Sequence, residues 1–106
     1  MTGVDGYRAL ADPTRRQILR LLREGDLAAG AIAEQFDMSW PSVSRHLGVL
    51  AAAGLVTANR HGQHLVYSLT TSVLADIVTE LADMAKVHQA SAPASRGKRR
   101  PAVAGR

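Results

Sequence analysis

Apolar residues recur at helical spacing in the stretch that follows Asp12. Ile18, Leu21 and Leu22 fall on one side of a helix, while the arginines of this stretch fall largely on others. Asp12 can accept hydrogen bonds from the first turn, and the proline after it lacks the N–H that a first turn leaves unpaired. Gly25 is a typical stop. This pattern predicts a helix between Asp12 and Gly25.

The residues before this helix are less regular. Residues 1–6 are small and polar, and we interpret them as a flexible lead-in. Residues 7–11 predict a short helix in which Tyr7 and Leu10 face inward.

Two further helices are predicted close together in the middle of the chain. The first spans about Ala29 to Phe36, and the second runs from Ser39, a good capping residue, to about Ala53. In the second helix Val43, Leu47 and Leu50 form a narrow buried stripe opposite small and polar side chains. Two short helices joined by a few residues in this way are typical of a helix-turn-helix.

The period of the pattern changes to two after Gly54. Residues 55–60 and 64–69 alternate like strands, with a turn around Gly62 between them, and this predicts a β-hairpin. A last helix then starts near Thr71 or Ser72. Its broad apolar face is more than one small domain needs to cover its core: Leu74, Ile77, Val78, Leu81, Met84 and Ala85.

These elements predict a mainly α fold with a small β-hairpin, a dimeric winged helix-turn-helix. The expected organisation is a flexible N-terminus over residues 1–6, a DNA-binding and dimerisation domain over 7–88, and a disordered basic tail over 89–106. The expected homodimer interface joins the first and last helices through Tyr7, Leu10, Leu74, Ile77, Val78, Leu81 and Met84.

Composition and charge narrow the class of function. The 106 residues include no cysteine, which excludes thiolate chemistry and disulfides, and we found no signal peptide or membrane-spanning pattern, so a cytoplasmic protein is expected. No catalytic or phosphate-binding motif is present, so an enzyme is not expected.

The net charge is +4, but five of the 13 basic residues lie between 91 and 106, leaving 8 basic residues against 9 acidic in the rest. The positions of the charges must therefore support DNA binding, because their total does not.

The candidate DNA-binding residues lie on the exposed side of the second middle helix and at the hairpin tip. In addition, Arg15 of the helix after Asp12 either anchors a phosphate or is an ordinary surface arginine. Arg45 can form a fork of hydrogen bonds with guanine, and short serines can reach phosphates or base edges. Trp40 either contacts DNA or packs over the preceding turn. For His46 we favour packing at the edge of the core over a place beside the DNA backbone. The full set is Arg15, Ser39, Trp40, Pro41, Ser42, Ser44, Arg45, His46, Arg60, His61 and Gln63.

Four stretches of this chain resemble one known family. ALADPTRRQILRLL, AGAIAEQF, SWPSVSRHLGVLAAAGLV and NRHGQHLVYSL together resemble the ArsR-type winged helix regulators, and among them the SdpR-like autorepressors. The resemblance covers about residues 7–85. It implies a dimer that represses transcription, often of its own operon, until a signal releases it.

The metal sites of that family are not matched here. GAIAEQF lacks the cysteine motif of many metal sensors. Asp76, Glu80, Asp83 and His88 offer carboxylate and imidazole ligands on the last helix, but Val78 stands where the family has an inner histidine. We interpret the three acidic residues as a solvated helix face, and we expect no metal and no cofactor.

Three points stay open at this stage. A metal- or ligand-responsive repressor of the same family is one alternative, and a winged helix that binds protein is a less favoured one. The basic tail either enters a minor groove or only keeps the chain soluble. The residues do not specify the operator, which is expected to be palindromic, the regulated genes or an inducer.

Overall fold

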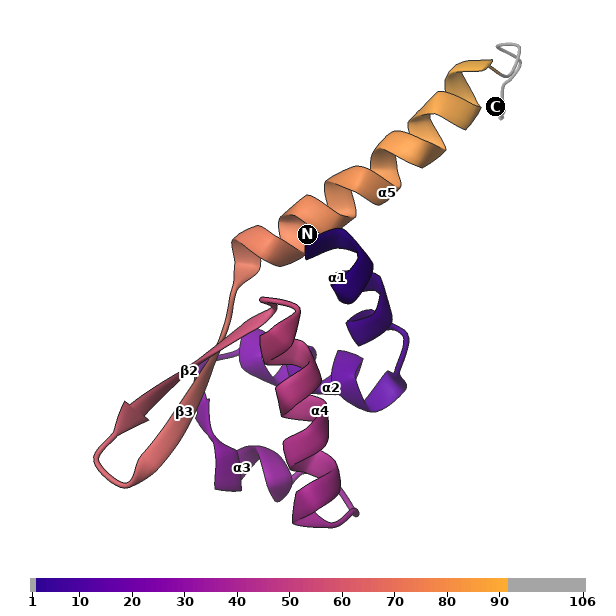
Figure 1. The fold of residues 1–106 in the computed structure, drawn as a ribbon. Coiled ribbons are helices and arrows are strands. Elements are labelled where there is room, and N and C mark those ends of the chain that lie inside the picture. The colour runs from indigo at the N-terminus through magenta and orange to yellow at the C-terminus, as the bar shows by residue number, and fades with distance from the viewer. Residues whose placement is uncertain (1, 92–106) are drawn as a thin grey trace.

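The computed structural model describes residues 2–91, with the surroundings of side chains from residue 5 to 86. Within these residues five helices and three strands follow one another (Figure 1): α1 Thr2–Leu10, α2 Pro13–Arg23, β1 Leu27–Ala28, α3 Ala29–Ala33, α4 Trp40–Ala52, β2 Val56–His61, β3 His64–Leu69 and α5 Thr71–Ser91. The prediction of a mainly helical winged helix-turn-helix is confirmed, with a sheet of three strands in the order β1-β3-β2.

Helix α1 differs from its predicted extent. It begins at Thr2, so residues 2–6 are helical and the expected flexible lead-in is wrong for them. Gly6 explains why this stretch has few apolar residues and still packs. A Cβ at Gly6 would lie 2.5 Å from Cδ1 of Ile77, so the absence of a side chain lets α1 approach α5 closely.

Helix α2 begins as predicted. The Asp12 carboxylate accepts hydrogen bonds from the backbone N–H groups of Thr14 at 2.8 Å and Arg15 at 3.2 Å. Its buried face is shifted from the prediction, because Leu19 is buried and Leu21 is only half-buried. The reason is that α2 packs against α1, α4 and β3, and this wide contact reaches Leu19.

Two short elements between α2 and α4 were not predicted correctly. Helix α3 ends at Ala33 and not near Phe36. Leu27 and Ala28 form strand β1, which pairs antiparallel with β3 opposite Tyr67 and Val66. Two residues are too few to show a period, so the pattern along the chain gave no signal for this strand.

Helix α4 matches its prediction closely. The Ser39 hydroxyl accepts a hydrogen bond from the Ser42 backbone N–H at 3.3 Å, and Val43, Leu47 and Leu50 are buried. Gly54 follows the helix with φ of 79°, a conformation that other residues rarely adopt.

The predicted hairpin is confirmed, with strands β2 and β3 in register from Val56 opposite Leu69 to His61 opposite His64. The two residues between the strands are Gly62, at φ of 63°, and Gln63, which suits a tight turn with glycine first. In Figure 1 this hairpin projects from one side of the helices as a wing, whereas α5 extends away from another side.

The core lies among α1, α2, α4 and the base of the wing. Its buried members are apolar: Ala9, Ile18, Leu19, Leu22, Ile32, Val43, Leu47, Leu50, Ala53, Leu55, Val56 and Ile77. Only Ile77 represents α5 among them, so most of the described length of this helix stands clear of the core.

Candidate nucleic-acid interface

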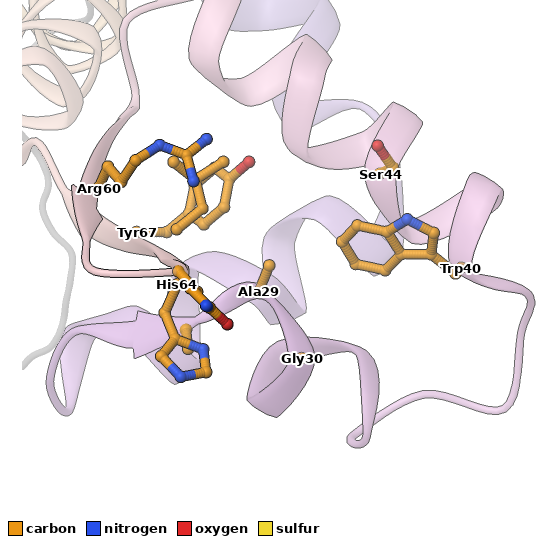
Figure 2. A pocket seen from close by; sticks show the side chains of 10 residues that line it. Ala29, Gly30, Trp40, Ser44, Arg60, His64 and Tyr67 are labelled. Carbon is orange, nitrogen blue, oxygen red and sulfur yellow. The ribbon is translucent and has the colours of Figure 1, made fainter.

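The exposed side of α4 faces a groove that is closed on its other side by the wing. The groove has a volume of about 460 Å³. Figure 2 shows Trp40 and Ser44 of α4 on one side, the wing residues Arg60, His64 and Tyr67 on the other, and the start of α3 between them. The packing that holds Val43, Leu47 and Leu50 inward is what turns this polar side of α4 outward.

The predicted residues of α4 are nearly all accessible. Trp40 is 50% exposed, and its indole faces the groove in Figure 2, so Trp40 is placed to meet a partner there. Pro41, Ser44 and Arg45 are exposed, and Ser42 is half-buried beside its bond with Ser39.

The wing brings the other predicted residues to the same region. Pairing of Arg60 with Leu65 and of Ala58 with Tyr67 puts Arg60 and Tyr67 on one face of the hairpin, toward the groove. Gln63 also lines the groove, whereas His61 lies at the exposed tip and does not.

The sequence pattern placed the lining residue His64 in the polar hairpin tip with Arg60, His61 and Gln63. It gave no DNA-binding role to the other lining residues, which are Ala28, Ala29, Gly30, Leu65 and Tyr67. Alternation along residues 64–69 predicted only that Tyr67 shares a face of the hairpin with Leu65 and Leu69. Its place at a groove depends on the angle between the wing and α4, which local spacing does not encode.

Arg15 is engaged inside the protein. Its Nε donates to the carbonyl oxygen of Ala9 at 2.8 Å and its Nη2 to that of Arg8 at 2.9 Å, so the guanidinium satisfies the end of α1. Its Nη1 lies 3.2 Å from Nδ1 of His46. These contacts favour a structural role for Arg15 over the predicted phosphate contact.

His46 and Asp12 complete this junction between α1, α2 and α4. The His46 side chain is 15% exposed, and its Nδ1 lies 3.9 Å from the Asp12 carboxylate. This geometry fits the interpretation of His46 as a residue packed at the edge of the core. Partial burial raises the pKa of Asp12, but hydrogen bonds from the Arg15 and Thr14 N–H groups, together with the charges of the His46 and Arg15 side chains, outweigh it, and the net pKa is below the usual value.

Arg45 and Arg60 contrast with this junction. Within residues 5–86 no hydrogen bond or ion pair engages either guanidinium. Both are therefore free, with respect to those residues, to bind an external anion or base edge.

The predicted dimer residues fall into three groups. Val78, Leu81 and Met84 are exposed on α5, at 57%, 47% and 57%. Tyr7, Leu10 and Leu74 are half-buried in their own subunit. Ile77 is 3% exposed and packs against α1 at Gly6, so its side chain lies in the core of its own subunit, and its contact with a second copy stays a prediction.

The acidic residues of α5 show no metal centre. The Tyr7 hydroxyl donates a hydrogen bond to the Glu80 carboxylate, and this bond, with partial burial and the Glu80 charge, raises the pKa of Tyr7. No group of three possible ligands occurs in the described part of the chain. The His88 side chain and the basic segment 92–106 lie outside the described residues. None of the described helices is long and apolar enough to cross a membrane.

Comparisons with known proteins agree with this geometry. A helix-turn-helix domain family matches residues 10–58. The chain is 50% identical over 72 residues to the transcriptional repressor SdpR of Bacillus subtilis, covering 68% of this chain and 80% of that protein. It is 44% identical over 75 residues to the HTH-type transcriptional regulator Rv2034 of Mycobacterium tuberculosis, covering 71% and 70%.

A solved structure shares the fold over nearly its whole length. The crystal structure of an ArsR family transcriptional regulator is similar with a TM-score of 0.78 at 26% identity, over 84% of this chain and 98% of that chain.

Proposed function

The chain belongs to the ArsR family of winged helix-turn-helix transcriptional regulators, and we propose that it represses transcription as a homodimer on a palindromic operator. The observation that carries this proposal is the groove between α4 and the wing, which Ser44 of α4 and Arg60 and Gln63 of the wing line with polar side chains. Arg45, the next residue of α4, does not line the groove but is exposed, and neither Arg45 nor Arg60 is engaged by residues 5–86. Its relatives are named as transcriptional regulators, which supports a DNA-binding function.

Helix α4 is the element proposed to enter the major groove. Arg45 would hydrogen-bond a guanine, and Ser42 and Ser44 would bond phosphates or base edges. Gly48 supports a close approach, because it is exposed and the space around its missing side chain is empty. Ser39, Trp40 and Pro41, at the start of α4, would lie at the edge of the DNA major groove.

The wing is proposed to bind the DNA backbone or the adjacent minor groove. Arg60 and Gln63 line the side that faces α4, and His61 is exposed at the tip. Their contribution would be mainly electrostatic and would weaken as salt rises. His46 and Arg15 would act indirectly, by fixing α4 against α2.

The proposed dimer buries the outer face of α5. Val78, Leu81 and Met84 expose apolar surface along one side of this helix, and isologous pairing with a second copy would cover it. Tyr7, Leu10 and Leu74 would contribute their remaining exposed surface at the edge of this contact.

The dimer is tested by replacing Leu81 with Glu. We expect monomers in sedimentation and operator binding weakened at least tenfold, because a charge would be buried in the interface. Thr79→Glu adds the same charge on the opposite side of α5 and should leave the dimer intact. A Leu81→Glu variant that sediments as a dimer would contradict the proposed interface.

The operator is tested by selecting duplexes from a random pool with the purified chain, and by footprinting DNA upstream of its own gene. An imperfect palindrome with half-sites about one helical turn apart is the expected outcome. A footprint over its own promoter would support autoregulation. Selection of no common sequence would contradict sequence-specific repression.

A further inference from the structure

A second cleft lies between α1, α2, β3 and the start of α5. Its volume is about 190 Å³, and it shares no lining residue with the groove between α4 and the wing. Four leucines form its apolar surface: Leu10, Leu19, Leu69 and Leu74. Leu10 and Leu74 are also placed at the edge of the proposed dimer contact, so the cleft adjoins that contact. We call this site the α2 cleft.

Three arginines of α2 line the rest of the cleft. Arg16, Arg20 and Arg23 follow one another at i, i+4 and i+7, so they form one stripe along the helix. Like charges at this spacing disfavour a helix unless an anion offsets them. The stripe therefore concentrates positive charge beside an apolar surface.

Much of this charge is unpaired within the described residues. Arg23 pairs with Glu24 at 3.3 Å on the surface. Arg16 donates to the carbonyl oxygen of Leu10 at 2.7 Å and Arg20 to the side-chain oxygen of Gln17 at 3.2 Å, but no carboxylate from residues 5–86 contacts either of them. Each guanidinium has five N–H donors, so most of them remain available.

We propose that the α2 cleft binds a small amphipathic carboxylate of the medium-chain fatty acid class. The alkyl chain would lie against the four leucines, and the carboxylate would accept hydrogen bonds from Arg16 and Arg20. Arginine suits this role because its planar fork matches the two oxygens of a carboxylate. The volume is below the roughly 300 Å³ at which sites for larger ligands begin, so a medium-length alkyl chain is preferred to a long one.

The ligand would contact four elements at once, among them α2, which packs on α4, and the base of α5. This places the cleft where an effector could reach both the DNA-binding and the dimerisation elements. Binding to the cleft does not require DNA, so this inference and the proposed repression can be tested, and can fail, separately.

The test is isothermal titration of the full-length chain with octanoate. Saturable binding at one site per subunit is expected. Octylamine has the same tail with a positive head, and acetate has the head without the tail, so neither should bind measurably. Arg20→Glu should weaken octanoate binding by about 10-fold to 100-fold, the range for a hydrogen-bonded charged group.

Two further variants keep this test interpretable. Arg20→Gln removes the positive charge without adding a negative one and should also weaken binding about tenfold or more. Arg8→Glu makes the same charge change on an exposed residue of α1 outside the cleft and should bind octanoate like the unaltered chain. Thermal unfolding of each variant checks that it is folded.

Four results would overturn the proposal. Equal binding of octanoate and octylamine, or unaltered binding by Arg20→Glu, would show that the arginines do not recognise the head group. Absence of octanoate binding by a chain that sediments as a dimer would mean that the second copy covers the cleft. If the unaltered chain did not bind octanoate and Arg20→Glu bound non-specific DNA more weakly, the arginine stripe of α2 would be assigned to DNA binding.

Discussion

Arg15 at the start of α2 and Arg45 in the middle of α4 carry the same guanidinium in different surroundings. Arg15 bonds the last carbonyl groups of α1 and contacts His46, so it joins three helices. Arg45 is exposed and makes no hydrogen bond or ion pair within residues 5–86. The same residue type thus serves the fold in one place and is left available to a partner in the other.

The difference extends to the elements on which these arginines lie. At the α1–α2 junction, Asp12 caps α2, Arg15 completes the end of α1, and His46 links both to α4. Trp40 and Ser44 of α4 line the groove that faces the wing, Arg45 is exposed beside Ser44 in the sequence, and the buried side chains Val43, Leu47 and Leu50 hold the helix in the core. Substitutions should therefore change stability at the junction and DNA recognition on α4.

The two sides of α4 give the largest expected contrast. Leu47→Ala should lower the free energy of unfolding by about 2–5 kcal/mol, because this side chain is fully buried and its removal leaves a cavity. Ser44→Ala, three residues earlier on the exposed side, should change it by less than about 0.5 kcal/mol. Urea titration of both variants measures this. A similar loss in the two variants would contradict the assignment of the two sides.

Arg15→Ala should have the next largest effect. It removes two hydrogen bonds to backbone carbonyl groups and the contact with His46, and the expected loss of stability is about 1–3 kcal/mol by urea titration.

Arg15→Lys separates a structural role from a phosphate contact. It keeps the positive charge but not the fork that reaches two carbonyl groups, so the free energy of unfolding should remain below that of the unaltered chain, as in Arg15→Ala. The opposite result would be unaltered stability in both variants, with DNA binding that is weaker in Arg15→Ala and normal in Arg15→Lys. That result would assign Arg15 to the DNA interface.

Asp12→Ala should lower the free energy of unfolding by about 0.5–2 kcal/mol through loss of the helix cap. The side chain is 33% exposed, which favours the lower part of this range. The folded pKa of Asp12 lies below its usual value of about 3.9, so its carboxylate stabilises the fold above that pH.

This contribution should disappear as the pH falls through the lowered folded pKa, since the carboxylate is then protonated in both states. Urea titrations of both proteins between pH 7 and pH 3 follow the difference, as far as the chain stays folded. If the difference in free energy of unfolding between the two proteins grew as the pH fell, the helix cap could not be the source of the lowered pKa of Asp12.

Sequence patterns predicted most of the fold because its long elements have clear caps and buried stripes. Asp12 and Ser39 mark the starts of α2 and α4 in the sequence, and Gly62 marks the turn of the wing. Strand β1 was not predicted because two residues are too few to show a period. The predicted start of α1 was too far along the chain, because the contact of α1 with α5 depends on the absence of a side chain at Gly6, which a pattern of apolar residues does not detect.

The candidate site was predicted unevenly for a related reason. The exposed side of α4 follows from helical spacing alone, so Ser44 and Arg45 were found. The engagement of Arg15 requires the end of α1 to stand beside α2, and the place of Tyr67 in the groove requires the angle of the wing. Both are tertiary relationships between segments, which a local pattern does not specify.

The binding of Arg45→Ala to operator and to scrambled duplex tests the recognition surface most directly. Measured by fluorescence anisotropy at one salt concentration, the variant should lose about 1–3 kcal/mol of discrimination, while its stability stays within about 0.5 kcal/mol of the unaltered chain. Arg45→Lys should recover binding to scrambled duplex but not discrimination, since lysine keeps the charge without the fork. Discrimination equal to that of the unaltered chain in Arg45→Ala would contradict α4 as the helix that reads the operator through this face.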